Sequence, residues 1–352
     1  MQIIFSKEKA LKKQMIFLAV VLLAFAAACS TAQSKSSKRD AENLKLLEQN
    51  VESTDSFFNQ GKDHLVKNEF DKALESFGKS KYSQALFYKA IALGQLGKAD
   101  EAQSAFKECV AKDILKNESN YNLAMISYDK GDASLAKELM ESVVSADPEH
   151  TGALFFLGNL KYLENDMDGA LSYYEKALKT QPDSTDLWEA VFSVRLQKEE
   201  FSKAWEIREK LDRSNIETVL NVLKVAEITG NYLKGAELVT EELMKDGNIS
   251  KMKRILLAKG GKFEEALRNA RKELENAGEG FVMIDRSTEA EGSYVIGVDR
   301  NSVFLVCSKD PQQFIPVTVS GGKVSIKDSQ LESGVSEISG LAKKFCLGNH
   351  SR

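Results

Sequence analysis

The chain has 352 residues, which is enough for two domains or for one elongated array with an appended module. Hydrophobic residues make up 43% of it and charged residues 28%, a composition that excludes a wholly disordered protein. The formal net charge is −4 and no domain is basic, so we expect no nucleic-acid partner.

Residues 1–28 have the pattern of a secretion signal. A basic stretch with Lys12 and Lys13 precedes an apolar run over residues 15–28, which is too short to span a bilayer comfortably but suits a signal core. The run ends in Ala26-Ala27-Ala28-Cys29-Ser30, which resembles the lipobox of bacterial lipoproteins, although Leu is commoner at the place of Ala26.

The resemblance implies that Cys29 is lipidated on its sulfur and becomes the new N-terminus. A multiply acylated cysteine is a stable membrane anchor. By analogy, Ser30 after the cysteine favours the outer membrane. The alternative is an ordinary cleaved signal followed by a chance cysteine. Residues 29–40 are small and polar, so we expect a flexible tether.

Residues 41–276 carry an internal repeat. Residues 154–182 contain two blocks with apolar residues at helical spacing, joined by a short polar turn. The same frame recurs every 34 residues, and the alanines that open the second block of each unit are Ala102, Ala136, Ala170 and Ala204. We expect about seven helix pairs, the first beginning near residue 53, with stacking supplying the core.

This pattern resembles the tetratricopeptide repeat, which reads W-x2-L-G-x2-Y, then A-x3-F, then P. The matching residues of the best unit are Leu157, Gly158, Ala170, Tyr174 and Pro182. Lys161 and Arg208 depart from the pattern, each standing where an aromatic residue is usual. The resemblance implies a mainly α fold, a right-handed solenoid with a concave groove that binds a peptide or helix.

After about residue 277 the pattern changes to short β-rich runs over residues 281–285, 294–298, 303–307, 314–319 and 324–326. Val335, Ile338, Leu341 and Phe345 then fit one face of a closing helix. We expect residues 277–352 to form a small antiparallel α+β module.

The cysteines after Cys29 have separate roles in this scheme. Cys109 takes a small-residue position in a second helix, so we expect a buried thiol. Cys307 and Cys346 both lie in the C-terminal module of an exported chain, where either a disulfide or two separate thiols are open, since the sequence does not show whether the side chains meet.

No pattern of residues indicates catalysis. His64, His150 and His350 stand alone, without metal-ligand spacing or a nucleophile motif. His64 takes an aromatic position of the first repeat, so we expect it to pack. We therefore expect no enzymatic activity, no metal and no cofactor.

Aromatic residues recur in the first helices of the repeats, at positions that face the groove in the tetratricopeptide fold. Such rigid side chains commonly anchor a partner. The alternative is that they fill contacts between adjacent units. The candidate groove residues are Phe58, Phe87, Tyr121, Met125, Tyr128, Phe155, Asn159 and Tyr162.

These features predict a lipid-anchored, non-enzymatic scaffold of the bacterial cell envelope that binds a protein or peptide. One alternative is that the C-terminal module binds a ligand or polysaccharide and the repeats are a spacer. Another is a surface-exposed lipoprotein that attaches to host molecules.

Overall fold

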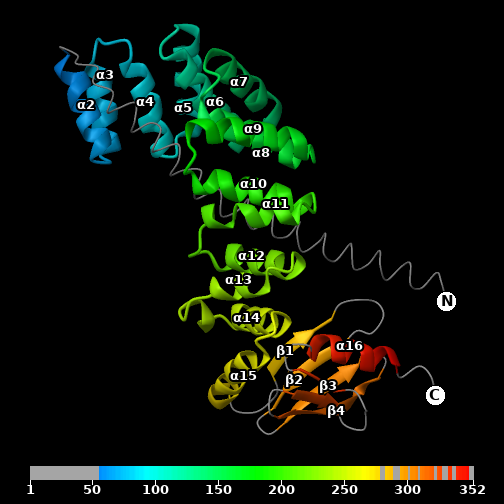
Figure 1. Ribbon diagram of the computed structural model, residues 1–352. Coiled ribbons are helices and arrows are strands. Elements are labelled where there is room, and N and C mark those ends of the chain that lie inside the picture. Colours follow the sequence, from blue (N-terminus) through cyan, green and yellow to red (C-terminus); the bar gives the residue numbers. More distant parts are fainter. Residues whose placement is uncertain are drawn as a thin grey trace. The chain divides into compact units, whose positions relative to one another are not determined.

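The computed structural model describes residues 55–277, 282–287, 294–299, 302–307, 310–320, 323–326, 332–334 and 338–348 (Figure 1). The expected signal peptide, Cys29 and the tether lie outside the described residues. The chain divides into two compact units, residues 1–160 and 161–352, and the division falls inside one helix. Each unit is described by itself below.

The described part of the first unit is helical throughout. Its helices follow one another with short connections, as the repeat predicts. They are α2 (Ser56–Val66), α3 (Phe70–Lys79), α4 (Ala85–Gln95), α5 (Ala99–Ala111), α6 (Lys116–Asp129), α7 (Ala133–Ala146) and α8 (Thr151–Leu163), which continues into the second unit.

The second unit continues the helical series and then becomes a sheet. Its helices before the sheet are α9 (Met167–Thr180), α10 (Thr185–Gln197), α11 (Phe201–Glu206), α12 (Ile216–Ile228), α13 (Tyr232–Glu237), α14 (Gly247–Lys259) and α15 (Phe263–Ala277). Two short 3₁₀ turns, Arg208–Lys210 and Leu243–Lys245, follow α11 and α13. These two second helices are therefore shorter than the repeat frame predicts.

One backbone motif closes the first helix of every pair from α2/α3 to α14/α15. The residue just past the helix adopts a left-handed conformation, which lets the next N–H groups bond back to the last turn. In the α6–α7 turn, the N–H of Asp132 donates to the Ser127 carbonyl over 2.9 Å. The left-handed residues of the seven turns are Asn68, Gly97, Gly131, Asn165, Glu199, Gly230 and Gly261.

Small residues set how closely the helices of a pair approach. In the first pair, a Cβ at Gly61 of α2 would lie 2.5 Å from the Phe77 ring of α3, so that ring packs directly on the glycine. Phe58, Ala73 and Phe77 belong to one buried cluster of the first unit. The helical spacing of apolar residues thus becomes a core only when the two helices of a pair and their neighbours meet.

The strands form one antiparallel sheet in chain order. Two of the predicted strands, over residues 294–298 and 303–307, are found without change. The strand that ends at Ser320 is longer than predicted, and the last short strand, over residues 332–334, was not expected. The elements are β1 (Val282–Arg286), β2 (Tyr294–Val298), β3 (Val303–Cys307), β4 (Asp310–Ser320), β5 (Lys323–Ile326), β6 (Glu332–Gly334) and the closing helix α16 (Ile338–Gly348).

The sheet and the last repeats share one hydrophobic core. A continuous buried cluster runs from Phe192 in α10 to Cys346 in α16 and includes Ile284 of β1. A disulfide between Cys307 and Cys346 fastens α16 to β3, with the two Cα atoms 5.5 Å apart. The C-terminal module is thus packed on α14 and α15 rather than attached to them by a linker.

Candidate functional site

Half of the candidate groove residues belong to the core of the first unit. Phe58 and Phe87 have no exposed surface, and Tyr121 and Met125 are 7% and 6% exposed. Phe58 packs edge-on against Tyr88, with the ring centroids 5.4 Å apart. A partner in a groove cannot reach such buried side chains. These four residues therefore fit the alternative better, in which they fill the contacts between adjacent repeats.

The other four candidate groove residues, Tyr128, Phe155, Asn159 and Tyr162, are half-buried. The Tyr128 ring of α6 packs edge-on against Phe156 of α8, with the centroids 5.2 Å apart. In the second unit, burial raises the pKa of the Tyr162 hydroxyl. These residues keep an accessible part, so they remain candidates for contact with a partner.

Glu189 in α10 takes the same repeat position as Phe155. Its carboxylate accepts a hydrogen bond from the Thr218 hydroxyl of α12 over 3.2 Å. Burial raises the pKa of Glu189, and the negative charges of Asp186 and Asp212 raise it further. Glu189 is therefore a partly buried acid of the second unit whose ionised form is disfavoured by its surroundings.

A second candidate site is a charged cavity of about 550 Å³ between α9 and the turn that joins α10 to α11. The residues that α9 contributes recur at intervals of three or four and so share one helix face. They are Asp168, Leu171, Ser172, Glu175, Lys176 and Lys179, and the opposite side is formed by Arg195, Lys198, Glu200 and Lys203.

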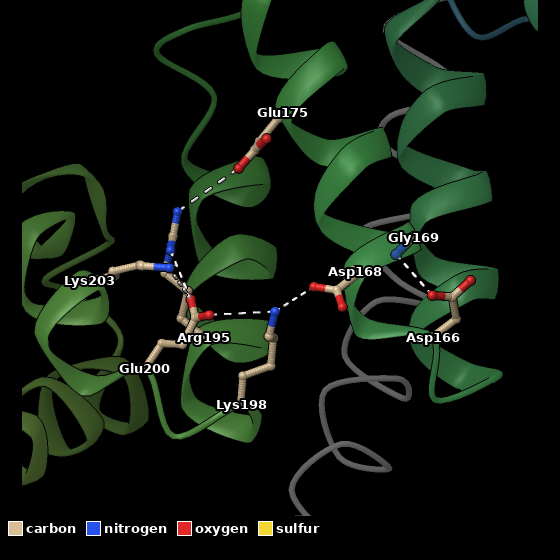
Figure 2. Close-up of polar contacts among 8 residues, drawn as sticks. All are labelled: Asp166, Asp168, Gly169, Glu175, Arg195, Lys198, Glu200 and Lys203. Carbon is tan, nitrogen blue, oxygen red and sulfur yellow. Dashed lines mark hydrogen bonds and ion pairs between the residues drawn. The ribbon is translucent and has the colours of Figure 1, made fainter.

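Glu200 is the centre of the ion-pair network in this cavity (Figure 2). Its carboxylate lies 3.2 Å from Arg195 Nη1, 3.2 Å from Lys203 Nζ and 3.4 Å from Lys198 Nζ. Hydrogen bonding to Lys203 is the largest cause that lowers the pKa of Glu200. Lys198 also pairs with Asp168, and so joins the α10–α11 turn to the first turn of α9.

Arg195 keeps unused hydrogen-bonding capacity beside this network. Its side chain is 16% exposed, and its Nη2 lies 4.0 Å from a Glu175 carboxylate oxygen, too far for a hydrogen bond. Its Nε atom is buried and has no hydrogen-bond partner. No motif in the sequence marks this cavity. Most of its residues are charged, and a charged helix face usually just contacts water, so nothing in the sequence indicates a site there.

The isolated histidines and Cys109 have structural surroundings. His64 Nδ1 lies 2.6 Å from a Glu69 carboxylate oxygen, so it is hydrogen-bonded and not merely packed as expected. His150 Nδ1 accepts the N–H of Ala153 at the start of α8. Cys109 is a buried thiol, as predicted, and burial raises its pKa to about 11. His350 lies outside the described residues.

Neither a metal site nor a membrane-spanning helix is present in the described part of the chain. No three His, Cys, Asp or Glu side chains there gather so as to hold a metal ion. None of the helices between residues 55 and 348 that the structure describes combines the length and apolarity that a membrane crossing needs.

Comparison with known proteins identifies the repeat. A family model described as "Tetratricopeptide repeat" matches residues 127–191, which hold all of α7, α8 and α9 with parts of α6 and α10. A second model, described as "Anaphase-promoting complex subunit 5", matches residues 50–128. A search of curated proteins gives no significant match.

Several solved structures are similar to part of the chain. A tetratricopeptide repeat protein from Parabacteroides merdae is 15% identical, with a TM-score of 0.42, and the match covers 64% of this chain and 93% of that one. A MamA structure from Desulfovibrio magneticus is 19% identical, with a TM-score of 0.39, and the match covers 44% of this chain and 90% of that one.

The fold follows from the repeat match and from the chain's own geometry. Residues 127–191 match the tetratricopeptide repeat, and helix pairs with the same left-handed closing turn continue on both sides of them. The chain is therefore mainly α, a tetratricopeptide-like solenoid followed by a small antiparallel sheet with a closing helix.

Proposed function

We propose that this chain is a non-enzymatic scaffold for protein–protein interaction, anchored to a membrane of the bacterial cell envelope through Cys29. It binds an extended segment or a helix of a partner along the first helices of its repeats. The localisation is the outer membrane, on its periplasmic or surface face. The anchor and the localisation rest on the N-terminal sequence, which lies outside the described residues.

The observation that carries the binding role is a set of half-buried side chains on the first helices of a tetratricopeptide-like array. Tyr128 lies in α6, and Phe155, Asn159 and Tyr162 lie in α8. Stacked helix pairs hold such side chains at fixed spacing, so a partner loses little additional side-chain entropy when it binds them. Burial of the four other candidate residues restricts the proposed contact to these positions.

Site-specific crosslinking in intact cells tests the binding role. A photoreactive amino acid at position 155 or 162 should capture one discrete partner, whereas the same amino acid at position 57 should not. Phe57 is a matched control because it is an aromatic residue of a first helix, is 42% exposed, and has the Lys79 ammonium of α3 5.9 Å from its ring centroid. Equal capture at all three positions would show that these helices have no specific site.

A separate experiment tests the anchor. The Cys29→Ser variant should lose labelling by an alkyne analogue of palmitate and leave the membrane fraction. Because the substitution lies far along the chain from residues 155 and 162, purified protein should keep partner binding. A variant that still incorporates the label would show that lipid is attached elsewhere.

The C-terminal module is a second candidate site, for a ligand or polysaccharide. Phe314 of β4 is 58% exposed, and its ring meets Phe304 of β3 edge-on with the centroids 5.0 Å apart. Phe304 is buried, so the exposed Phe314 ring is the apolar surface that this part of the sheet offers to a ligand ring. A Phe314→Ser variant should lose retention on immobilised envelope polysaccharide if this module is the binding site, and retain it otherwise.

A further inference from the structure

The cavity beside α9 concentrates positive charge in an acidic protein. Five basic and three acidic side chains line it, whereas the whole chain has a net charge of −4. The acidic side chains are already engaged. Glu200 contacts three basic groups and Asp168 pairs with Lys198, which leaves only Glu175 loosely held.

Two lysines of α9 supply the charge that this network does not neutralise. Lys176 and Lys179 are exposed, and within the described part of the chain neither pairs with a carboxylate within 4.0 Å. The Lys176 ammonium lies 5.6 Å from the centroid of the Tyr173 ring. Both lysines line the cavity on the face of α9 that also carries Glu175.

Arg195 adds a directional group to this charge. Nη1 donates to Glu200 over 3.2 Å, Nε has no hydrogen-bond partner, and Nη2 is 4.0 Å from Glu175. Because Nε is buried, Nη2 is the atom of this guanidinium that is left for a ligand, and a hydrogen bond from a guanidinium to a carboxylate is stronger than one between neutral groups. Figure 2 shows the guanidinium between Glu175 and Glu200.

We propose that this cavity binds an acidic segment of a protein partner. One carboxylate of the segment accepts a hydrogen bond from Nη2 of Arg195, and neighbouring carboxylates contact Lys176 and Lys179. Glu175 is 59% exposed and turns away when the segment binds, so it acts as a competing carboxylate. The cavity is distinct from the proposed contact at residues 155 and 162, because none of its lining residues lies in α6 or α8.

Binding of a fluorescent hexaglutamate peptide to the full-length chain tests this site. The Glu175→Gln variant should bind about threefold more tightly, because it removes the competing charge and one like charge from the cavity. The Lys176→Gln, Lys179→Gln double variant should bind about fivefold more weakly, since it removes two exposed charge contacts. Both effects should diminish as salt is raised.

A matched double variant, Lys224→Gln with Lys234→Gln, controls for net charge. It removes the same charge from two exposed lysines of the second unit that lie outside the cavity, and it should leave peptide affinity unchanged. Equal weakening by both double variants would overturn the proposal, as would unchanged affinity in Glu175→Gln.

Two further arms separate other sources of anions. Inorganic phosphate or vesicles containing phosphatidylglycerol should compete with the peptide less well than free hexaglutamate does. If either displaces the peptide better, the cavity selects a phosphate group and the proposal of an acidic protein segment is wrong. None of these variants changes the residues proposed for the first-helix contact, so the two proposals can fail independently.

Discussion

Arg254 of α14 shows how a single buried charge joins three elements. It is 2% exposed, and burial lowers its pKa, whereas the Glu273 charge of α15 opposes that shift. Its Nε donates to the Met283 carbonyl of β1 over 3.1 Å, and its Nη1 contacts Glu273 and donates to the Ser250 hydroxyl. The guanidinium therefore connects the last helix pair to the first strand.

Replacing Arg254 with Met should lower the free energy of unfolding by about 3 kcal/mol. The apolar chain keeps most of the volume but removes the charge that pairs with Glu273, which retains only the Ser250 hydroxyl, and removes the Nε donor of the Met283 carbonyl. Urea denaturation should show this loss. The Lys245→Met variant is the control. Lys245 forms an ion pair with Glu242 in which both side chains are exposed, so losing it should lower the free energy of unfolding by less than about 1 kcal/mol. Similar losses in both variants would argue against a special role for the buried pair.

Glu189 should make the stability of the chain depend on pH. Burial raises its folded-state pKa above 4.5, the ordinary pKa of a glutamate side chain. The folded state therefore binds the proton more tightly than the unfolded state does. The carboxyl's contribution is therefore most favourable below pH 4.5 and is lost as the pH rises through the folded-state pKa. The Glu189→Gln variant should be more stable than wild type at pH 7.

The difference in stability between wild type and the Glu189→Gln variant should shrink as the pH falls toward 4.5. Thermal melts of both between pH 4.5 and 7 measure this change, and subtracting one curve from the other cancels groups such as Glu200, whose pKa is lowered. A constant difference across that range would show that the Glu189 pKa is not raised.

Side-chain exposure was the feature that the sequence predicted least well. The 34-residue spacing puts Tyr121 and Phe155 at equivalent repeat positions, yet Tyr121 is buried and Phe155 is only half-buried. Exposure depends on what the neighbouring helix places over a ring, and a periodic pattern does not contain that information. The cavity was missed for a related reason, since Asp168 and Lys198 are 30 residues apart and meet only in the folded chain.

At the scale of elements, the conformational preference of the residue at the left-handed position explains all but one of the turns within helix pairs. Six of the seven left-handed positions hold Gly or Asn, the residues that adopt this conformation most readily. The seventh is Glu199, with φ of 58°, in the turn that carries Lys198 and Glu200 into the charged cavity. Its side chain is exposed, so the conformation costs energy without a visible contact in return.

Replacing Glu199 with Gly should therefore raise the free energy of unfolding by about 1 kcal/mol, since glycine has no Cβ penalty at positive φ. The reverse test is Gly131→Ala at the equivalent turn, where φ is 88° and a similar loss is expected. Chemical denaturation of the two variants beside wild type checks both signs. Destabilisation by Glu199→Gly would mean that its side chain makes a contact important for stability.

The strand ranges were predicted well where a continuous apolar run lies between turn residues, and less well elsewhere. The β2 and β3 ranges match the prediction because branched and aromatic residues fill them between turn residues. β4 begins at Asp310, earlier than expected, because the polar and proline residues before Phe314 give no strand signal. The short α11 and α13 were likewise expected to be full helices.

At the scale of the whole molecule, the change of sequence pattern at residue 277 predicts a domain boundary there, but the hydrophobic core continues across it. Buried residues continue from the last helix pairs into the sheet without a break, and Arg254 and the disulfide cross between elements of this region. Removing the sheet would uncover the surfaces of α14 and α15 that it now covers. Loss of binding by a chain cut at this point would therefore not identify the sheet as the binding site.

A chain ending at Ala277 should be markedly less stable than the full chain. Ile284, Ile296 and Leu305 are fully buried, and each side chain of this size contributes roughly 2 kcal/mol of hydrophobic stabilisation that the shortened chain loses. A lower melting temperature and stronger binding of an apolar dye are expected, while Phe314→Ser in the full chain should leave both unchanged, because that ring is exposed. If the shortened chain melts as the full chain does, the repeats fold independently of the sheet, and truncation becomes a valid way to assign function to either part.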